Sequence, residues 1–64
     1  MSLSFEELSI GDSFIIYDDL KEQAETIDVY QKVFVSEGAN AVMAAGYAPA
    51  KFRPHVKVIR LTLK

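Results

Sequence analysis

Basic side chains recur at every second position toward the end of the chain, a spacing that could bind the phosphates of a nucleic acid. The series consists of Lys51, Arg53, His55 and Lys57, and Arg60 follows it. Residues two apart on a β-strand point to the same face. A strand that included residue 53 would therefore present a basic stripe beside the ring of Phe52. Surfaces that combine cations with aromatic rings bind single-stranded nucleic acids.

The distribution of charge along the chain argues against this function. The net charge is −2, with nine acidic and two basic residues in 1–50 but five basic and no acidic residues in 51–64. Attraction to phosphates dominates nonspecific nucleic-acid binding, and a pI near 5.2 opposes it. The basic strand could instead pair with acidic neighbours such as Asp28 or the segment 18–25. Nucleic-acid binding is therefore kept as the alternative function.

Aromatic residues near the expected strand ends point to protein recognition. The chain has three tyrosines, four phenylalanines and no tryptophan, more rings than a small barrel can hide. Extended peptides often bind between such rings, although the lack of tryptophan weakens the case for a proline-rich ligand. We expect Phe5, Phe14 and Phe34 to fill the core and its rim. The candidate protein-binding residues are Tyr17, Tyr30, Tyr47 and Phe52.

Residues for catalysis or metal binding are sparse. The chain has no cysteine and one histidine, His55, whereas nucleophilic catalysis needs a base oriented beside a hydroxyl or thiol. The carboxylates of segment 18–25 lack the ligand spacing and central glycine of a calcium loop. The three glycines are too scattered for a phosphate-binding loop. We therefore expect a non-enzymatic protein without a cofactor or structural metal.

The rest of the pattern predicts the elements that position these residues. Ser4 and Glu7 have the spacing of a capping box, which predicts one N-terminal helical turn. Dense or alternating β-branched and aromatic residues predict strands over 13–17, 26–35, 41–46 and 55–63. We expect a loop or one helical turn at 18–25, a hairpin turn at 36–40 and a loop at 47–54, where two prolines exclude regular ladder pairing.

The strand expected at 26–35 alternates in polarity. One face carries Ile27, Val29, Val33 and Val35, and the other carries Asp28, Tyr30, Lys32 and Phe34. Such alternation is typical of a half-buried strand, and either face could be the core face.

Short strands with these connections form an antiparallel meander, which can hide its edges by rolling up. We therefore expect an all-β fold and a single domain over residues 1–64. The expected architecture is a small antiparallel SH3-like barrel of four to five strands with a short N-terminal helical turn. An OB-like barrel or an open α+β sheet is the alternative.

Three motifs together span most of the chain. They are Phe5-x-x-Leu8-x-x-Gly11-Asp12-x-Phe14, Val29-Tyr30-x-Lys32-Val33 and Phe52-x-Pro54-x-Val56. This pattern resembles that of a group of short bacteriophage and bacterial proteins of SH3-like barrel type. The resemblance implies the barrel fold and a phage or phage-like origin, and it brings no catalytic residue or ligand. The alanine-rich segment 39–50 departs from the pattern because it is longer and more apolar.

Apolar surface is expected to exceed what this chain can cover. A chain of 64 residues buries only about 60% of its unfolded surface, and segments 13–17 and 55–63 are apolar on both faces. Large exposed apolar patches usually mark an interface. We therefore expect a protein-interaction module that binds a host or virion protein and self-associates as a homo-oligomer. No stretch has the ~18 apolar residues of a membrane span, so we expect a location in the cytoplasm or a virion and no membrane partner.

Overall fold

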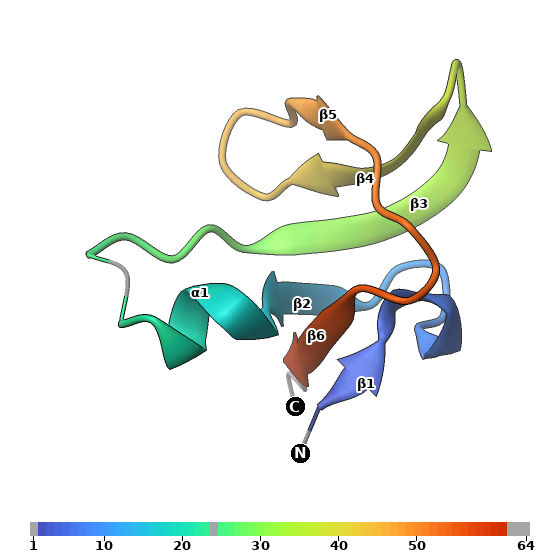
Figure 1. Ribbon diagram of the computed structural model, residues 1–64. Coiled ribbons are helices and arrows are strands. Elements are labelled where there is room, and N and C mark those ends of the chain that lie inside the picture. Colours follow the sequence, from blue (N-terminus) through green and yellow to red (C-terminus); the bar gives the residue numbers. More distant parts are fainter. Residues whose placement is uncertain (1, 24, 62–64) are drawn as a thin grey trace.

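The computed structural model describes residues 2–23 and 25–61, which form one antiparallel sheet and two short helical segments (Figure 1). In this part of the chain the strands are β1 (Leu3–Ser4), β2 (Ser13–Ile16), β3 (Tyr30–Ser36), β4 (Ala39–Met43), β5 (Pro49–Ala50) and β6 (Lys57–Leu61). The helical segments are the 3-10 helix η1 (Phe5–Glu7) and the α-helix α1 (Tyr17–Lys21). The strand order is β1-β6-β2-β3-β4-β5, so the first and last strands are neighbours.

The predicted all-β antiparallel fold with an N-terminal helical turn is confirmed. The described residues form six strands rather than four or five, because two-residue pairings extend the sheet at both edges. Their strand order leaves β1 and β5 at opposite edges, so the sheet is curled without closing into a barrel. Pro49 lies in β5 opposite Val42, where a loop was expected. An edge strand accepts proline because its outer side needs no N–H donor.

Several predicted strands are shorter than expected. The strand expected at 26–35 begins at Tyr30, and the strand expected at 55–63 begins at Lys57. Residues 62 and 63 of the latter lie outside the described residues. A loop or one helical turn was expected at the acidic segment 18–25, and the structure has one helical turn there, α1. The β3–β4 hairpin turns at Glu37 and Gly38, whose φ values of 52° and 85° match a tight turn between twisted strands.

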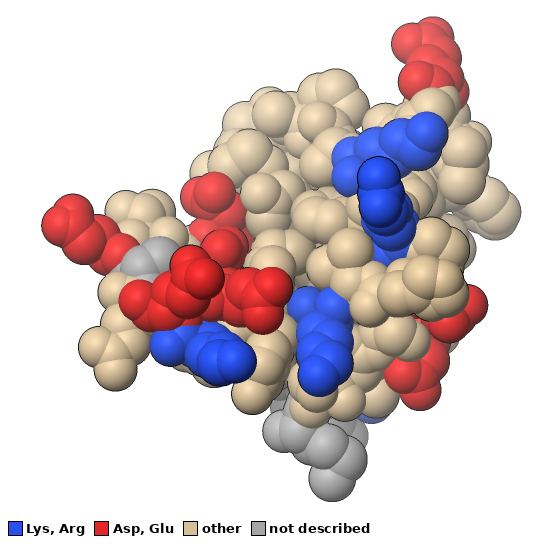
Figure 2. Space-filling model, viewed as in Figure 1, with Lys and Arg blue, Asp and Glu red and all other residues tan. Residues whose placement is uncertain are grey.

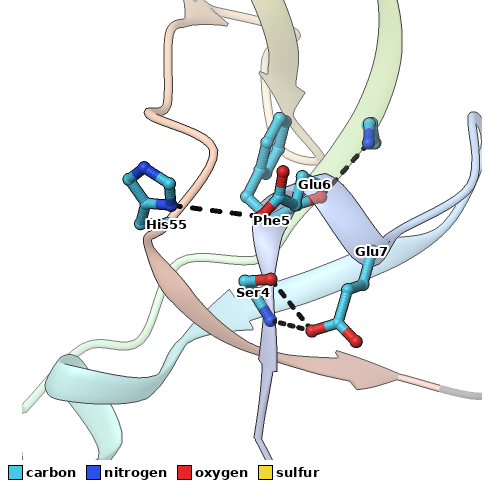
Figure 3. A network of polar contacts seen from close by, with 6 residues as sticks. Ser4, Phe5, Glu6, Glu7 and His55 are labelled. Carbon is cyan, nitrogen blue, oxygen red and sulfur yellow. Dashed lines mark hydrogen bonds and ion pairs between the residues drawn. The ribbon is translucent and has the colours of Figure 1, made fainter.

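The N-terminal helical turn has the expected cap. The Glu7 carboxylate accepts hydrogen bonds from the Ser4 backbone N–H and from the Ser4 hydroxyl, both at 2.9 Å (Figure 3). These bonds favour the ionised carboxylate and lower the pKa of Glu7. After η1, the Asp12 carboxylate accepts a bond of 2.8 Å from the Ser9 N–H, and Gly11 has a φ of 98°. This turn directs the chain from η1 into β2.

The core lies inside the curl of the sheet. Its buried side chains are Phe5, Leu8, Phe14, Ala41 and Val58. Four rings pack together there, because Phe52 lies 5.4 Å from both Phe5 and Phe14 and 5.0 Å from Tyr30, between ring centroids. The core placement predicted for Phe5 and Phe14 is therefore confirmed.

The core placement predicted for Phe34 is wrong, because its side chain is 79% exposed. Tyr30 and Lys32 do face inward, so alternation alone would bring Phe34 inward too. However, Lys32 pairs with Ala41 and Ser36 pairs with Ala39, so the register shifts between these two pairs. A bulge of this kind breaks the alternation of side chains. It leaves the end of the β3–β4 hairpin projecting from the body of the protein (Figure 1).

Candidate protein-binding groove

An apolar groove of about 480 Å³ opens beside the outer half of β3. One wall is formed by Val33, Phe34 and Val35 of β3, and the opposite wall by η1 and the turn that contains Ile10. The segment that joins β5 to β6 closes the inner end with Phe52 and Pro54. The charged side chains that line the groove are those of Glu6, Lys32 and Lys51. The arrangement is an apolar channel with a few polar groups, as is typical of ligand sites.

The inner end of the groove is held in place by an amide side chain. Asn40 of β4 donates a hydrogen bond from Nδ2 to the Phe52 carbonyl and accepts one at Oδ1 from the Phe52 N–H, both at 2.9 Å. These two bonds fix the Phe52 backbone against β4. The Phe52 ring can therefore pack on Phe5 at the inner end of the groove.

Lys32 ties the two walls together. Its Nζ donates hydrogen bonds to the carbonyl oxygens of Phe5 (3.1 Å) and Leu8 (2.7 Å). The same ammonium lies 4.7 Å from the centroid of the Phe5 ring, within the range of a cation–π interaction. The charge of this half-buried lysine is thus satisfied by the carbonyls of η1 and the residue that follows it. The spacing between β3 and η1 is fixed as a result.

The outer half of β3 has a free edge on the groove side. Among the described residues, the pairing of β2 with β3 ends at Ser13 and Gln31, and two backbone bonds between Lys32 and the Gly11–Asp12 turn follow it. Beyond Lys32 this side of the strand faces the groove. Val35 is 74% exposed and Ile10 49% exposed. A free strand edge beside apolar side chains is the arrangement that binds extended peptides by strand addition.

The structure does not bring the four aromatic candidates together. Tyr30 and Phe52 pack in the core, and Phe52 is the member of the four that lines the groove. Tyr17 begins α1, where the Lys57 Nζ lies 5.9 Å from its ring centroid. Tyr47 is 74% exposed in the turn between β4 and β5, with a φ of 56°. These rings therefore belong to three separate places in the fold.

The basic candidates are exposed but do not form a strand-based stripe. Because β6 begins at Lys57, residues 53–56 form a turn closed by a bond of 3.2 Å from the Val56 N–H to the Arg53 carbonyl. The condition for alternation from residue 53 therefore fails. The exposed residues of the series are Lys51, Arg53, His55, Lys57 and Arg60. In Figure 2, basic side chains gather over the segment between β5 and β6, and acidic ones gather over α1.

Two of these residues meet acidic partners, although not the expected ones. His55 Nδ1 lies 3.9 Å from Glu6 Oε2 (Figure 3). Arg60 Nη1 lies 3.9 Å from Asp12 Oδ2. Asp28 and segment 18–25 were the expected partners. Arg60 meets Asp12 instead because β6 pairs with β2, which places Arg60 opposite Phe14 and close to the turn before β2.

Comparison with known proteins gives no match: no family model, curated protein or solved structure matches this chain. In residues 2–23 and 25–61, no group of three histidine, aspartate or glutamate side chains is placed to hold a metal ion. No helix in the described part of the chain has the length and apolar composition required to cross a membrane.

Sequence patterns did not indicate the exposed groups of the groove: Ile10, Phe34 and Val35. One signal could have indicated them. The expected strand 26–35 is twice as long as the strand expected at 13–17. A short strand cannot pair along the whole of a long neighbour, so part of the longer strand must keep a free edge. The uncharged run Val33-Phe34-Val35 lies in that part.

Proposed function

We propose that this chain is a non-enzymatic protein-interaction module that binds an extended segment of another protein in the groove. The segment would add to the outer half of β3 as a further strand, and its apolar side chains would cover Phe34, Val35 and Ile10. The observation that carries the proposal is the coincidence of a free strand edge with exposed apolar side chains on one groove. Main-chain hydrogen bonds supply affinity in such complexes, and side-chain pockets supply specificity.

Motif resemblance extends the proposal to origin and family. The spacing of Phe5, Leu8, Gly11 and Phe14 supports membership of the phage and bacterial group of SH3-like barrel type. The curled antiparallel order of the strands agrees with this fold. On this basis the partner is a host or virion protein, and the complex forms in the cytoplasm or in the virion.

A library of random peptides, selected on the folded chain, tests the binding proposal and does not require the natural partner. We expect the selected peptides to carry apolar residues at alternate positions, because a strand presents every second side chain to one face. Methylation of the peptide amides that face β3 abolishes binding if strand pairing holds the complex. We expect the amide chemical shifts of the chain to change on peptide binding at Val33, Phe34, Val35 and Ile10.

Phe34→Ser provides the matching change in the protein. Loss of a large side chain at the centre of an interface typically costs about 2 kcal/mol, which weakens binding by about 30-fold. Tyr47→Asn is the control, because Tyr47 is an equally exposed aromatic residue outside the groove. Peptides that bind with the same affinity to both variants, or that shift only the signals of Tyr17 and Tyr47, contradict the proposal.

A second candidate function is nucleic-acid binding by the exposed basic residues of 51–60. The basic side chains that gather over the segment between β5 and β6 in Figure 2 support it, and the acidic side chains over α1 oppose it. Binding of single-stranded DNA or RNA should then weaken steeply as salt rises. The triple variant Lys51→Ala, Arg53→Ala and Lys57→Ala should lose that binding. Affinity unchanged by the triple variant, or no binding at low salt, rules this function out.

A further inference from the structure

We propose that the protein segment bound in the groove is acidic where it passes Lys51 and Arg53. Its apolar side chains would fill the groove, and adjoining aspartate or glutamate side chains would pair with these two cations. The partner is therefore a protein segment in which an apolar run adjoins an acidic run. This inference rests on the proposed function, because it uses the same groove and adds the charge of its occupant.

The two cations lie on either side of the residue that closes the inner end of the groove, Phe52. Both are exposed, and Lys51 itself lines the groove. The Phe52 ring packs inward on Phe5, and the two bonds from Asn40 fix the Phe52 backbone. The backbone that carries Lys51 and Arg53 is therefore held in place before a partner binds, which lowers the cost of ordering on association. Figure 2 shows basic side chains gathered over this segment.

Lys51 and Arg53 lack an acidic partner within the described part of the chain. The ion pairs among residues 2–23 and 25–61 use His55 and Arg60. Lys32 also lines the groove, but its ammonium already donates to two carbonyls and contributes nothing to the attraction argued here. The charged groups of Lys51 and Arg53 are thus available to carboxylates from another molecule.

The carboxylates near these cations do not cancel their charge. The Glu6 carboxylate lines the groove but lies 3.9 Å from His55 Nδ1 (Figure 3). Glu37 and Lys51 line a separate hollow of about 290 Å³ beside the β3–β4 hairpin, without forming an ion pair. Two unpaired cations therefore lie beside one unpaired carboxylate, and an excess of positive charge remains. Complementary charge of this kind selects a partner and speeds association.

An acidic protein segment fits this surface better than a nucleic acid. The cations adjoin an apolar groove, which alternate side chains of an extended peptide can fill. A long nucleic-acid chain laid across the face in Figure 2 would also meet the acidic side chains over α1. A short acidic run beside the groove avoids them.

Peptides selected for binding in the groove are the probes for this inference. Each is made with a run of aspartate, asparagine or lysine at one end, and the set is repeated with the run at the other end. We expect aspartate at one of the two ends to tighten binding by about 2- to 5-fold per ion pair relative to asparagine. Lysine at that end should weaken binding. Both differences should shrink as salt rises, because the charges are exposed.

Charge reversal in the protein locates the effect. In Lys51→Glu and in Arg53→Glu the preference for aspartate should fall, and in the double variant the lysine-tailed peptide should bind best. Lys21→Glu is the matched control, because it changes the net charge equally at an exposed lysine of α1. Circular dichroism of all variants should match that of the original chain, since these side chains are exposed.

The outcomes distinguish this inference from the proposed function. Peptides that bind in the groove with the same affinity whatever their tail contradict the inference and leave the peptide-binding proposal standing. The absence of any peptide that binds in the groove contradicts both. A preference for aspartate that survives the double variant, or that Lys21→Glu reduces equally, overturns the assignment to Lys51 and Arg53. Single-stranded oligothymidylate that binds at these two residues, while an aspartate tail gives no gain, overturns it in favour of nucleic acid.

Discussion

The side-chain amide of Asn40 contacts the backbone of Phe52 in the way that one strand residue contacts another. It donates to the carbonyl and accepts from the N–H of the same residue, with both distances at 2.9 Å. The regular pairing of β5 with β4 ends at Ala50, opposite Ala41. The amide therefore continues the attachment of the chain to β4 by two residues. This contact places the Phe52 ring among the other three rings of the core.

Asn40→Ala should lower the free energy of unfolding by about 1–3 kcal/mol, because it leaves the N–H and carbonyl of Phe52 without these partners. Urea denaturation measures the loss. Gln31→Ala is a suitable control, since the exposed Gln31 amide donates a single bond of 3.2 Å to the Gly11 carbonyl. Equal losses in the two variants would show that the Asn40 contact has no special role.

Phe34 and Phe52 should differ strongly in their contribution to stability. Phe52→Ala removes a ring from the aromatic core and should cost about 3 kcal/mol or more. Phe34→Ala should change the stability of the monomer by no more than about 0.5 kcal/mol, because its ring is mostly in water. Denaturation of both variants at protein concentrations low enough to exclude dimers measures the two losses of stability. A large loss of stability in Phe34→Ala would contradict the exposed position of the Phe34 ring.

Lys32→Met should destabilise the fold by about 1.5–3 kcal/mol, the typical value for hydrogen bonds to a charged group. The methionine keeps the apolar stem but leaves the carbonyls of Phe5 and Leu8 without the ammonium donor. Lys51→Met, at an exposed lysine of the same groove, is the control for loss of charge. Thermal denaturation of the two variants at equal concentration should show a decrease in Tm for Lys32→Met alone.

The lowered pKa of Glu7 predicts a pH dependence of stability. The folded state favours the ionised carboxylate through the two bonds from Ser4, so the folded pKa lies below the unfolded one. The stabilising contribution is complete above the unfolded pKa and is lost as the pH falls through the folded pKa. Glu7→Gln should therefore make the urea midpoint less dependent on pH in the acidic range. An identical pH profile in this variant would contradict the prediction.

The sequence predicted correctly those elements that depend on residues close together in the chain. The Ser4–Glu7 spacing predicted the first helical turn, and Gly38 marked the hairpin, because each depends on residues close in the chain. Phe34 was wrongly placed in the core because side chains alternate between the two faces of a strand only where the strand pairing keeps a regular register. The bulge between Lys32 and Ser36 arises from the pairing with β4, which strand polarity does not reveal.

The candidate site depended on contacts between distant parts of the chain. Phe52 lies in a segment with two prolines that resembles a surface loop, yet Asn40, twelve residues earlier, holds it over the core. Lys32 was expected on an aromatic face, but its bonds to the carbonyls of Phe5 and Leu8 depend on how η1 docks against β3. The free edge of β3 follows from where β2 begins, at Ser13.

The pairing of Leu3 with Val58 also determines when the protein can fold during synthesis. The ribosome releases β1 first, but the partner strand of β1 is made after almost all of the other described elements. Until residues 57 and 58 have left the exit tunnel, β1 has no neighbour and β2 has only one of its two neighbours. Folding of this sheet is therefore expected to be completed only after residues 57–61 have emerged from the ribosome.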